Sequence, residues 1–113
     1  MNDEQMKHML QELSEFLHSA YGDRLKSVIL YGSVARGTQT DESDIDIMVL
    51  VDGDDTVLRS YSDKLSDVST GMSLKYCRVF SIIDVSYQEY EDWEHISPFY
   101  SNVSREGVVL YAA

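Results

Sequence analysis

Hydrophobic residues near the start of the chain recur every three or four positions, as they do on one face of an amphipathic helix. The residues that follow this pattern are Met6, Met9, Leu10, Leu13, Phe16, Leu17 and Tyr21. The spacing predicts a helix over residues 3–21 whose apolar face packs against a core. Gly22 is its expected stop, because glycine commonly follows the last turn of a helix.

Three segments farther along the chain have the pattern of β-strands. Residues 27–31 form a short apolar run that predicts a buried strand. Residues 44–51 begin with strict alternation, so Asp44 and Asp46 share one face of a second strand. The opposite face of that strand carries Ile45, Ile47, Val49 and Val51. Residues 78–87 predict a third strand, in which Asp84 shares a face with Arg78, Phe80, Ile82 and Ser86.

The remaining patterns predict two more helices and a last apolar segment. Residues 57–72 have a second amphipathic repeat that ends near Gly71, after an acidic turn at residues 54–55 that can cap it. Residues 97–105 predict a short helix, because a serine followed by a proline has the form of an N-cap and first helical residue. Residues 108–111 form a short segment compatible with a strand. This order predicts a single α/β (α+β) domain over residues 1–113, with helices covering a sheet of about four strands.

The composition narrows the class of protein. The chain has 113 residues, 43% of them hydrophobic, which suits one compact domain. No run of 18 apolar residues is present, so no membrane span is expected. The acidic N-terminus is unlike a signal peptide. The single cysteine, Cys77, excludes an internal disulfide framework and makes the cytoplasm the expected compartment.

The charge balance is strongly acidic. The 20 acidic and 9 basic residues give a formal net charge of -11. Such a surface repels phosphate backbones, so direct nucleic-acid binding is not expected. It would attract a basic protein partner. An enzyme of this charge that binds a nucleoside triphosphate must neutralise it locally, and a divalent metal is the obvious means.

A glycine and a serine follow the first predicted strand. Gly32 lets the backbone approach a phosphate without a side-chain clash. Ser33 offers an N–H group and a hydroxyl to that phosphate, and the residues after it can begin a short helix whose amides favour an anion. Arg36 is close enough along the chain to add a charge-assisted contact. We therefore expect Gly32, Ser33 and Arg36 to bind the nucleotide.

Three aspartates are the candidate catalytic residues and metal ligands. Asp44 and Asp46 point the same way, and two carboxylates this close repel each other unless a cation lies between them. Such oxygen ligands suit Mg²⁺ or Mn²⁺, which also bind triphosphate oxygens. Asp84 lies in an apolar run, where a carboxylate is costly to bury unless it is paired or metal-bound. Placed beside the other two, it completes a site for two metal ions that activate the attacking hydroxyl and stabilise the leaving pyrophosphate.

Each of these features alone also has an ordinary structural interpretation. A Gly-Ser pair is common in turns. Alternating aspartates fit the polar face of an edge strand, and Asp84 fits a salt-bridged strand residue. Their combination, in this order and on these predicted elements, favours the catalytic interpretation.

The run from Gly32 to Asp46 resembles the signature of the DNA polymerase β-like nucleotidyltransferase superfamily. That signature is a Gly-Ser pair, ten intervening residues and Asp-x-Asp, and residues 34–43 are the ten here. Three segments are similar to the minimal nucleotidyltransferase (MNT) subgroup: Tyr-Gly-Ser-Val-Ala-Arg-Gly, Ser-Asp-Ile-Asp-Ile and the ending Ser-Arg-Glu-Gly-Val-Val-Leu-Tyr. The resemblance spans about residues 25–113.

The resemblance implies a nucleotidyltransferase fold with a mixed sheet. It assigns the triphosphate to Gly32 and Ser33, and the metal to Asp44, Asp46 and Asp84, the last of which would also help to deprotonate the acceptor. Many MNT proteins are antitoxins paired with HEPN-domain ribonuclease toxins, and several transfer AMP from ATP to a tyrosine of the toxin. Aminoglycoside and tRNA nucleotidyltransferases carry a further helical domain for the acceptor, which does not fit in this chain. The acceptor is therefore expected to come from a partner.

The leading hypothesis is a Mg²⁺-dependent protein adenylyltransferase of the cytoplasm that modifies a hydroxyl, expected to be tyrosine, of a HEPN-domain toxin. It would form one half of a toxin–antitoxin system, in a hetero-oligomer with its partner. Two alternatives stay open. The chain is a non-catalytic antitoxin that acts by binding, or it is a small-molecule nucleotidyltransferase with a separate helical subunit. The residues do not distinguish ATP from other NTPs.

Overall fold

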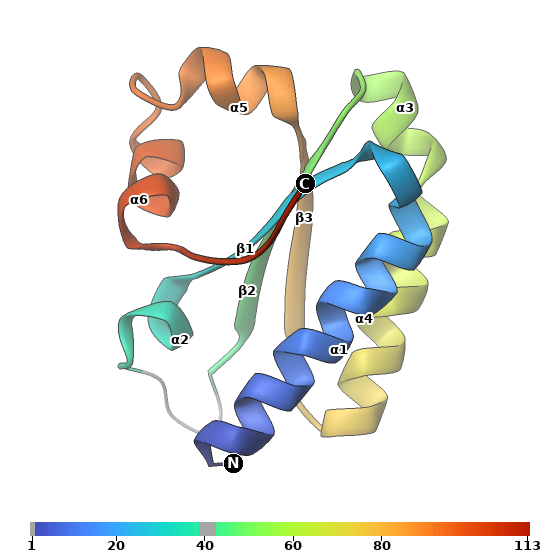
Figure 1. Cartoon of the computed structure of the whole chain (residues 1–113), viewed down its shortest axis with the longest axis vertical. Helices are drawn as coiled ribbons and strands as arrows, with labels where there is room; N and C mark the ends of the chain where they lie inside the picture. Colours follow the sequence, from blue (N-terminus) through green and yellow to red (C-terminus); the bar gives the residue numbers. More distant parts are fainter. Residues whose placement is uncertain (1, 39–42) are drawn as a thin grey trace.

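A four-stranded sheet forms the centre of the computed structural model, which describes residues 2–38 and 43–113 (Figure 1). The order across the sheet is β3-β2-β1-β4. The strands are β1 (Leu25–Tyr31), β2 (Ile45–Val51), β3 (Phe80–Ser86) and β4 (Val108–Ala112). β1 runs antiparallel to both of its neighbours, whereas β2 and β3 are parallel. The mixed α+β sheet expected from the sequence is confirmed.

Helices cover both faces of this sheet (Figure 1). On one face lie α1 and α4, with α3 leading into α4, and on the other lie α5 and α6. The short α2 follows β1 directly, and a 3-10 turn joins α1 to β1. Their bounds are α1 (Asp3–Tyr21), the 3-10 turn (Gly22–Arg24), α2 (Gly32–Arg36), α3 (Asp55–Ser60), α4 (Ser62–Tyr76), α5 (Tyr87–Trp93) and α6 (Pro98–Glu106). Among the described residues, no helix combines the length and the apolar character that a membrane span requires.

α1 begins and ends where the hydrophobic pattern predicts. Asn2 caps its first turn, because the side chains of Asn2 and Gln5 each accept a hydrogen bond from the backbone N–H of the other residue. The apolar face is buried, and Met9 and Leu13 are fully enclosed. Gly22 follows the helix with a φ of 61°, a backbone conformation that favours glycine.

The two faces of β2 belong to separate cores. On one face, Ile45, Ile47, Val49 and Val51 pack with residues of α1 and α4. On the other, Met48 and Leu50 pack with residues of α5 and α6. Because successive strand residues alternate between faces, Asp46 points to the α5–α6 side of the sheet.

The helix predicted over residues 57–72 is instead two helices. Tyr61 separates α3 from α4, and α4 continues past Gly71. Gly71 is exposed, and a glycine there weakens a helix by only about 1 kcal/mol. Burial of the adjacent Met72 side chain contributes about 1.5–3 kcal/mol and outweighs that loss. The helix ends at Cys77, whose φ of 53° is left-handed.

The end of the third predicted strand is also different. The strand predicted over residues 78–87 stops at Ser86, and the next residue begins α5, which the sequence analysis did not predict. The Ser86 hydroxyl caps this helix by accepting a hydrogen bond from the Glu89 N–H. The helix predicted over residues 97–105 is confirmed as α6, because Ser97 caps it and Pro98 is its first residue.

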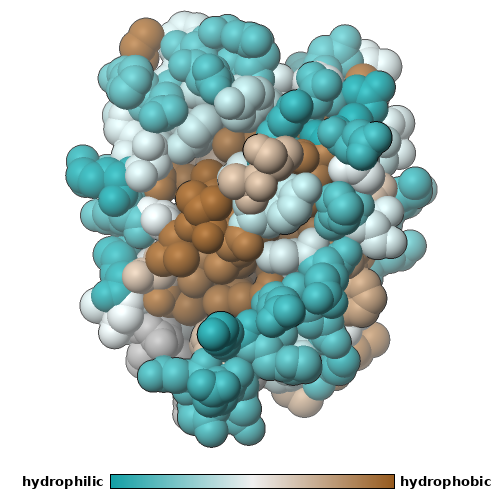
Figure 2. Space-filling view, in the orientation of Figure 1, coloured by the Kyte–Doolittle hydropathy of each residue, from teal (hydrophilic) through white to brown (hydrophobic). Residues whose placement is uncertain are grey.

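β4 leaves an apolar edge on the surface. Figure 2 shows apolar surface gathered on the face where β4 and α1 lie side by side. Val108 and Val109 of β4 are 46% and 59% exposed. Met6 and Leu10 of α1 line the groove next to this strand. The groove lies apart from the turn that carries Gly32 and Ser33, none of whose residues line it.

Candidate active site

The glycine-serine turn meets the paired aspartates where β1 ends and β2 begins. The antiparallel register pairs Tyr31, the last residue of β1, with Asp46 of β2. A Cβ built on the next residue, Gly32, would lie 3.1 Å from Cγ of Asp46 and closer still to its Oδ2. Gly32 also has a φ of 75°, at which residues with a Cβ are strained. Position 32 therefore needs glycine both for its backbone angle and for the space that the Asp46 carboxylate occupies.

The two aspartates concentrate negative charge at this end of the sheet. Partial burial raises the pKa of Asp46 and the charge on Asp44 raises it further, whereas Arg36 opposes both effects. Burial and the charge on Asp46 also raise the pKa of Tyr31. Asp44 itself is exposed. A cation beside the two carboxylates would relieve their mutual repulsion.

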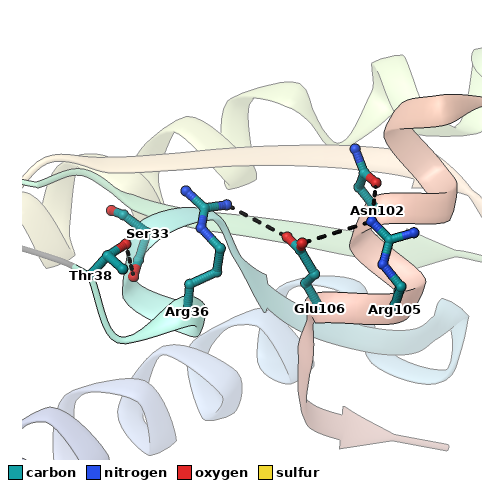
Figure 3. Close-up of polar contacts among 6 residues, drawn as sticks. All are labelled: Ser33, Arg36, Thr38, Asn102, Arg105 and Glu106. Carbon is teal, nitrogen blue, oxygen red and sulfur yellow. Dashed lines mark hydrogen bonds and ion pairs between the residues drawn. The ribbon is translucent and has the colours of Figure 1, made fainter.

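Local hydrogen bonds hold the turn that carries Ser33 (Figure 3). The Ser33 carbonyl accepts hydrogen bonds from the Thr38 backbone N–H at 3.0 Å and from the Thr38 hydroxyl at 3.4 Å. Val34 is buried and anchors α2 in the core. Arg36 forms an ion pair with Glu106 of α6 at 3.6 Å, with side chains that are 48% and 39% exposed. An exposed ion pair of this kind contributes little to stability, so it does not hold Arg36 firmly in place.

A residue to which the sequence analysis assigned no role fixes the backbone around Asp44. Arg78, which precedes β3, donates a hydrogen bond from its guanidinium to the Ser43 carbonyl at 2.8 Å. The Ile45 N–H donates to the Val79 carbonyl, also at 2.8 Å. The two bonds flank Asp44 and tie the start of β2 to β3. The only feature of the sequence that could have indicated this role is that Arg78 is a basic residue in a strongly acidic chain. Residues 39–42 of the motif lie outside the described residues.

Asp84 does not join the other two aspartates, which corrects the expected set of three carboxylates. In the parallel register of β2 and β3, Asp84 lies beside Val49, whereas Asp46 lies beside Ser81. Asp84 is also on the opposite face of the sheet, where its Oδ2 accepts a hydrogen bond from the Tyr21 hydroxyl at 3.0 Å. Tyr21 belongs to the core that α1 and α4 form with the sheet. Asp84 therefore has a structural partner and no route to a metal held by Asp46.

Replacing Tyr21 with phenylalanine is expected to destabilise the fold and to leave the active site intact. The Tyr21 ring is buried and stacks on Tyr61 at a centroid distance of 4.8 Å, which phenylalanine preserves. The lost hydroxyl leaves the half-buried Asp84 carboxylate without this donor, which costs roughly 1 kcal/mol, because water reaches part of the group. Chemical denaturation of the purified variant measures this change.

The Asp84→Ala variant is the matched control for this pair. It should destabilise the fold by a similar amount, and the double variant should lose less stability than the sum of the two single changes. Metal binding should be unchanged in all three proteins. A loss of metal affinity in Asp84→Ala alone would instead return Asp84 to the metal site.

The donors at the site fit a divalent cation that arrives with a nucleotide. Within residues 2–38 and 43–113, no three His, Cys, Asp or Glu side chains are grouped closely enough to hold a metal ion. Asp44 and Asp46 are two carboxylates on one face, and the absence of a side chain at Gly32 leaves room for the Asp46 carboxylate beside the turn. Mg²⁺ is usually held by one or two carboxylates together with substrate phosphates.

Comparison with known proteins agrees with this arrangement. Residues 10–97 match the model of the nucleotidyltransferase domain family. The chain belongs to this family. A Methanocaldococcus jannaschii protein, provisionally named a protein adenylyltransferase, is 39% identical to this nucleotidyltransferase over 111 residues. The alignment covers 98% of this chain and 100% of that protein.

Solved structures share the fold of this nucleotidyltransferase at low sequence identity. A protein provisionally described as a minimal nucleotidyltransferase aligns with a TM-score of 0.61 and 18% identity, over 96% of this chain and 95% of the other. A chain from the complex of a tri-AMPylated Shewanella oneidensis HEPN toxin with its MNT antitoxin aligns with a TM-score of 0.56 and 15% identity. That alignment covers 95% of this chain and 73% of the other. The fold is therefore that of a minimal nucleotidyltransferase.

Proposed function

We propose that this nucleotidyltransferase transfers AMP from ATP to a tyrosine hydroxyl of a HEPN-domain toxin and thereby acts as the antitoxin. The observation that carries the proposal is the close approach of Gly32 to Asp46, because a glycine-serine turn that can receive a phosphate then lies against a pair of carboxylates. The name of the archaeal relative supports a protein acceptor, and the AMPylated toxin of the Shewanella complex supports the class of partner. The one cysteine, Cys77, is free, which agrees with a reaction in the cytoplasm.

Each residue at the site has a proposed role that follows from its position. Gly32 and Ser33 would hold the triphosphate, and Arg36 would add a charged contact on its outer side. Asp44 and Asp46 would hold Mg²⁺ or Mn²⁺, which when bound offsets the charge of the triphosphate and of the departing pyrophosphate. The expectation of two ions depended on Asp84. The carboxylates that lie together support one ion.

The proposed reaction exchanges one phosphorus–oxygen bond for another. The acceptor oxygen forms a bond to the α-phosphorus of ATP, the bond from that phosphorus to the bridging oxygen breaks, and pyrophosphate leaves with the bridging oxygen. The hydroxyl proton passes to solvent. The contribution of the chain is to fix the phosphates against the sheet, since holding the reactants in place removes much of the entropic barrier.

The charge of the chain suits a partner with a basic surface. A net charge of -11 attracts such a protein over a distance and accelerates their encounter. This attraction does not depend on catalysis. Neutralisation of a toxin by binding alone is therefore the second candidate function.

We expect the α-phosphate of labelled ATP to appear on a HEPN-domain partner protein when both proteins and Mg²⁺ are present. The Asp44→Ala variant should transfer no label, because it removes half of the metal ligands. Asp52→Ala is the matched control, since Asp52 is an exposed aspartate just beyond the other end of the same strand, and it should transfer normally.

Two outcomes would change the proposal. A stable complex that accepts no label from any NTP, and whose toxin stays neutralised by Asp44→Ala, would establish neutralisation by binding. Label on a small hydroxyl compound, but not on the partner protein, would establish a small-molecule nucleotidyltransferase.

A further inference from the structure

A row of three side chains crosses the sheet at the active site. Tyr31 of β1 pairs with Asp46 of β2, and Asp46 pairs with Ser81 of β3. Residues paired across neighbouring strands point to the same face, and this face is the one on which Met48 and Ile83 pack toward α5 and α6. The neighbours of Asp46 on either side are therefore a phenol and a hydroxyl, and neither is a carboxylate.

Ser81 holds the position from which β3 can reach a cation beside Asp46. Adjacent strands lie about 4.8 Å apart, so side chains at paired positions can bind the same ion. A serine hydroxyl is neutral and is a weaker ligand for a hard divalent cation than a carboxylate is. The described part of the chain thus offers two charges to the ion, from Asp44 and Asp46, and affinity for such ions rises with the number of charged ligands.

We propose that Ser81 makes metal binding conditional on the nucleotide: the two carboxylates hold the cation weakly alone, and triphosphate oxygens supply the missing charged ligands. The inference rests on the proposed function for the position of the nucleotide. Asp44 and Asp46 would then hold the cation firmly only together with a bound triphosphate. An aspartate at position 81 would convert this site into one that binds the metal without nucleotide.

The test measures binding of Mn²⁺ to the nucleotide-free full chain, with free Mn²⁺ followed by electron paramagnetic resonance. Ser81→Asp is expected to bind Mn²⁺ at least about tenfold more tightly than the wild type, because it adds a third charged ligand. Ser86→Asp is the matched control. It adds the same charge to the same strand at the far end, where aspartate can keep the cap of α5, and its affinity should equal that of the wild type.

A second variant keeps the test decisive if Ser81→Asp does not fold. Ser81→Asn replaces the hydroxyl with a carbonyl oxygen on a longer side chain, still without charge, and should give a smaller increase in Mn²⁺ affinity than a third charge would. The inference is overturned if the wild type binds nucleotide-free Mn²⁺ as tightly as Ser81→Asp, or if neither variant exceeds Ser86→Asp. Because this measurement needs no acceptor, failure of label transfer to the partner would count against the proposed function and not against this inference.

Discussion

The Gly32→Ala variant is expected to lose nucleotidyl transfer by a factor of at least about 100, the effect of moving a catalytic group by roughly 1 Å. The added methyl group would overlap the Asp46 carboxylate, 3.1 Å from its Cγ. The carboxylate is the far end of a side chain, so it can rotate away, and the collision is relieved by moving the metal ligand. The fold should therefore survive while the site is lost. Transfer to the partner protein and chemical denaturation measure the two effects.

Gly37→Ala separates this collision from backbone strain. Gly37 has a φ of 74°, close to the 75° of Gly32, but no described atom lies within 4 Å of a Cβ built there. Both variants should lose about 1–2 kcal/mol of stability, because both place an alanine in the left-handed region. Only Gly32→Ala should lose transfer and the binding of Mn²⁺ together with a nucleotide. If Gly32→Ala keeps as much transfer activity as Gly37→Ala, the observed position of the Asp46 carboxylate is not needed for transfer.

Much of the fold follows from local signals in the sequence. The apolar repeat of α1 is long and has a cap at each end, so its bounds were predicted closely. The alternation of residues 44–51 placed Asp46 opposite Ile45 and Ile47, as the structure shows. The break of residues 57–72 at Tyr61 carries no such signal. α5 was missed because Ser86 and Tyr87 continue the alternation of the strand before them, and only the cap marks the change.

Local patterns in the sequence predict only some of the residues that lie together at the site. Gly32 and Asp46 could be brought together from the sequence because one strand leads into the turn and the next begins with the aspartates. Asp84 could not be placed, because β3 is apolar on both faces and its alternation does not say which face meets α1. That choice depends on the parallel register with β2. Ser81 became visible as the neighbour of Asp46 only through the same register.

The Asp46→Asn variant is expected to lose more than roughly 100-fold in transfer. Mutation of a residue that only hydrogen-bonds to a metal ligand typically costs roughly 10–100-fold, and Asp46 is proposed as a ligand itself. It removes one of the two carboxylates that lie together, so binding of Mn²⁺ with a nucleotide should fall as well. In contrast to most substitutions at a half-buried residue, it should not weaken the fold. Without metal, the Asp46 charge is partly buried and faces Asp44, and asparagine removes both penalties.

The sign of this stability effect can be tested with pH. Because the pKa of Asp46 is raised in the folded protein, the folded state binds the proton more readily than the unfolded chain does. The wild type should therefore lose stability as the pH rises from the ordinary aspartate pKa of about 3.9 through the higher pKa of the folded state. Asp46→Asn cannot titrate, so with EDTA present its stability should match the wild type at the acid end and exceed it at pH 7. Mg²⁺ with nucleotide should stabilise only the wild type. If Asp46→Asn is less stable than the wild type at pH 7 with EDTA present, the attraction between Asp46 and Arg36 outweighs both the burial of Asp46 and its repulsion from Asp44.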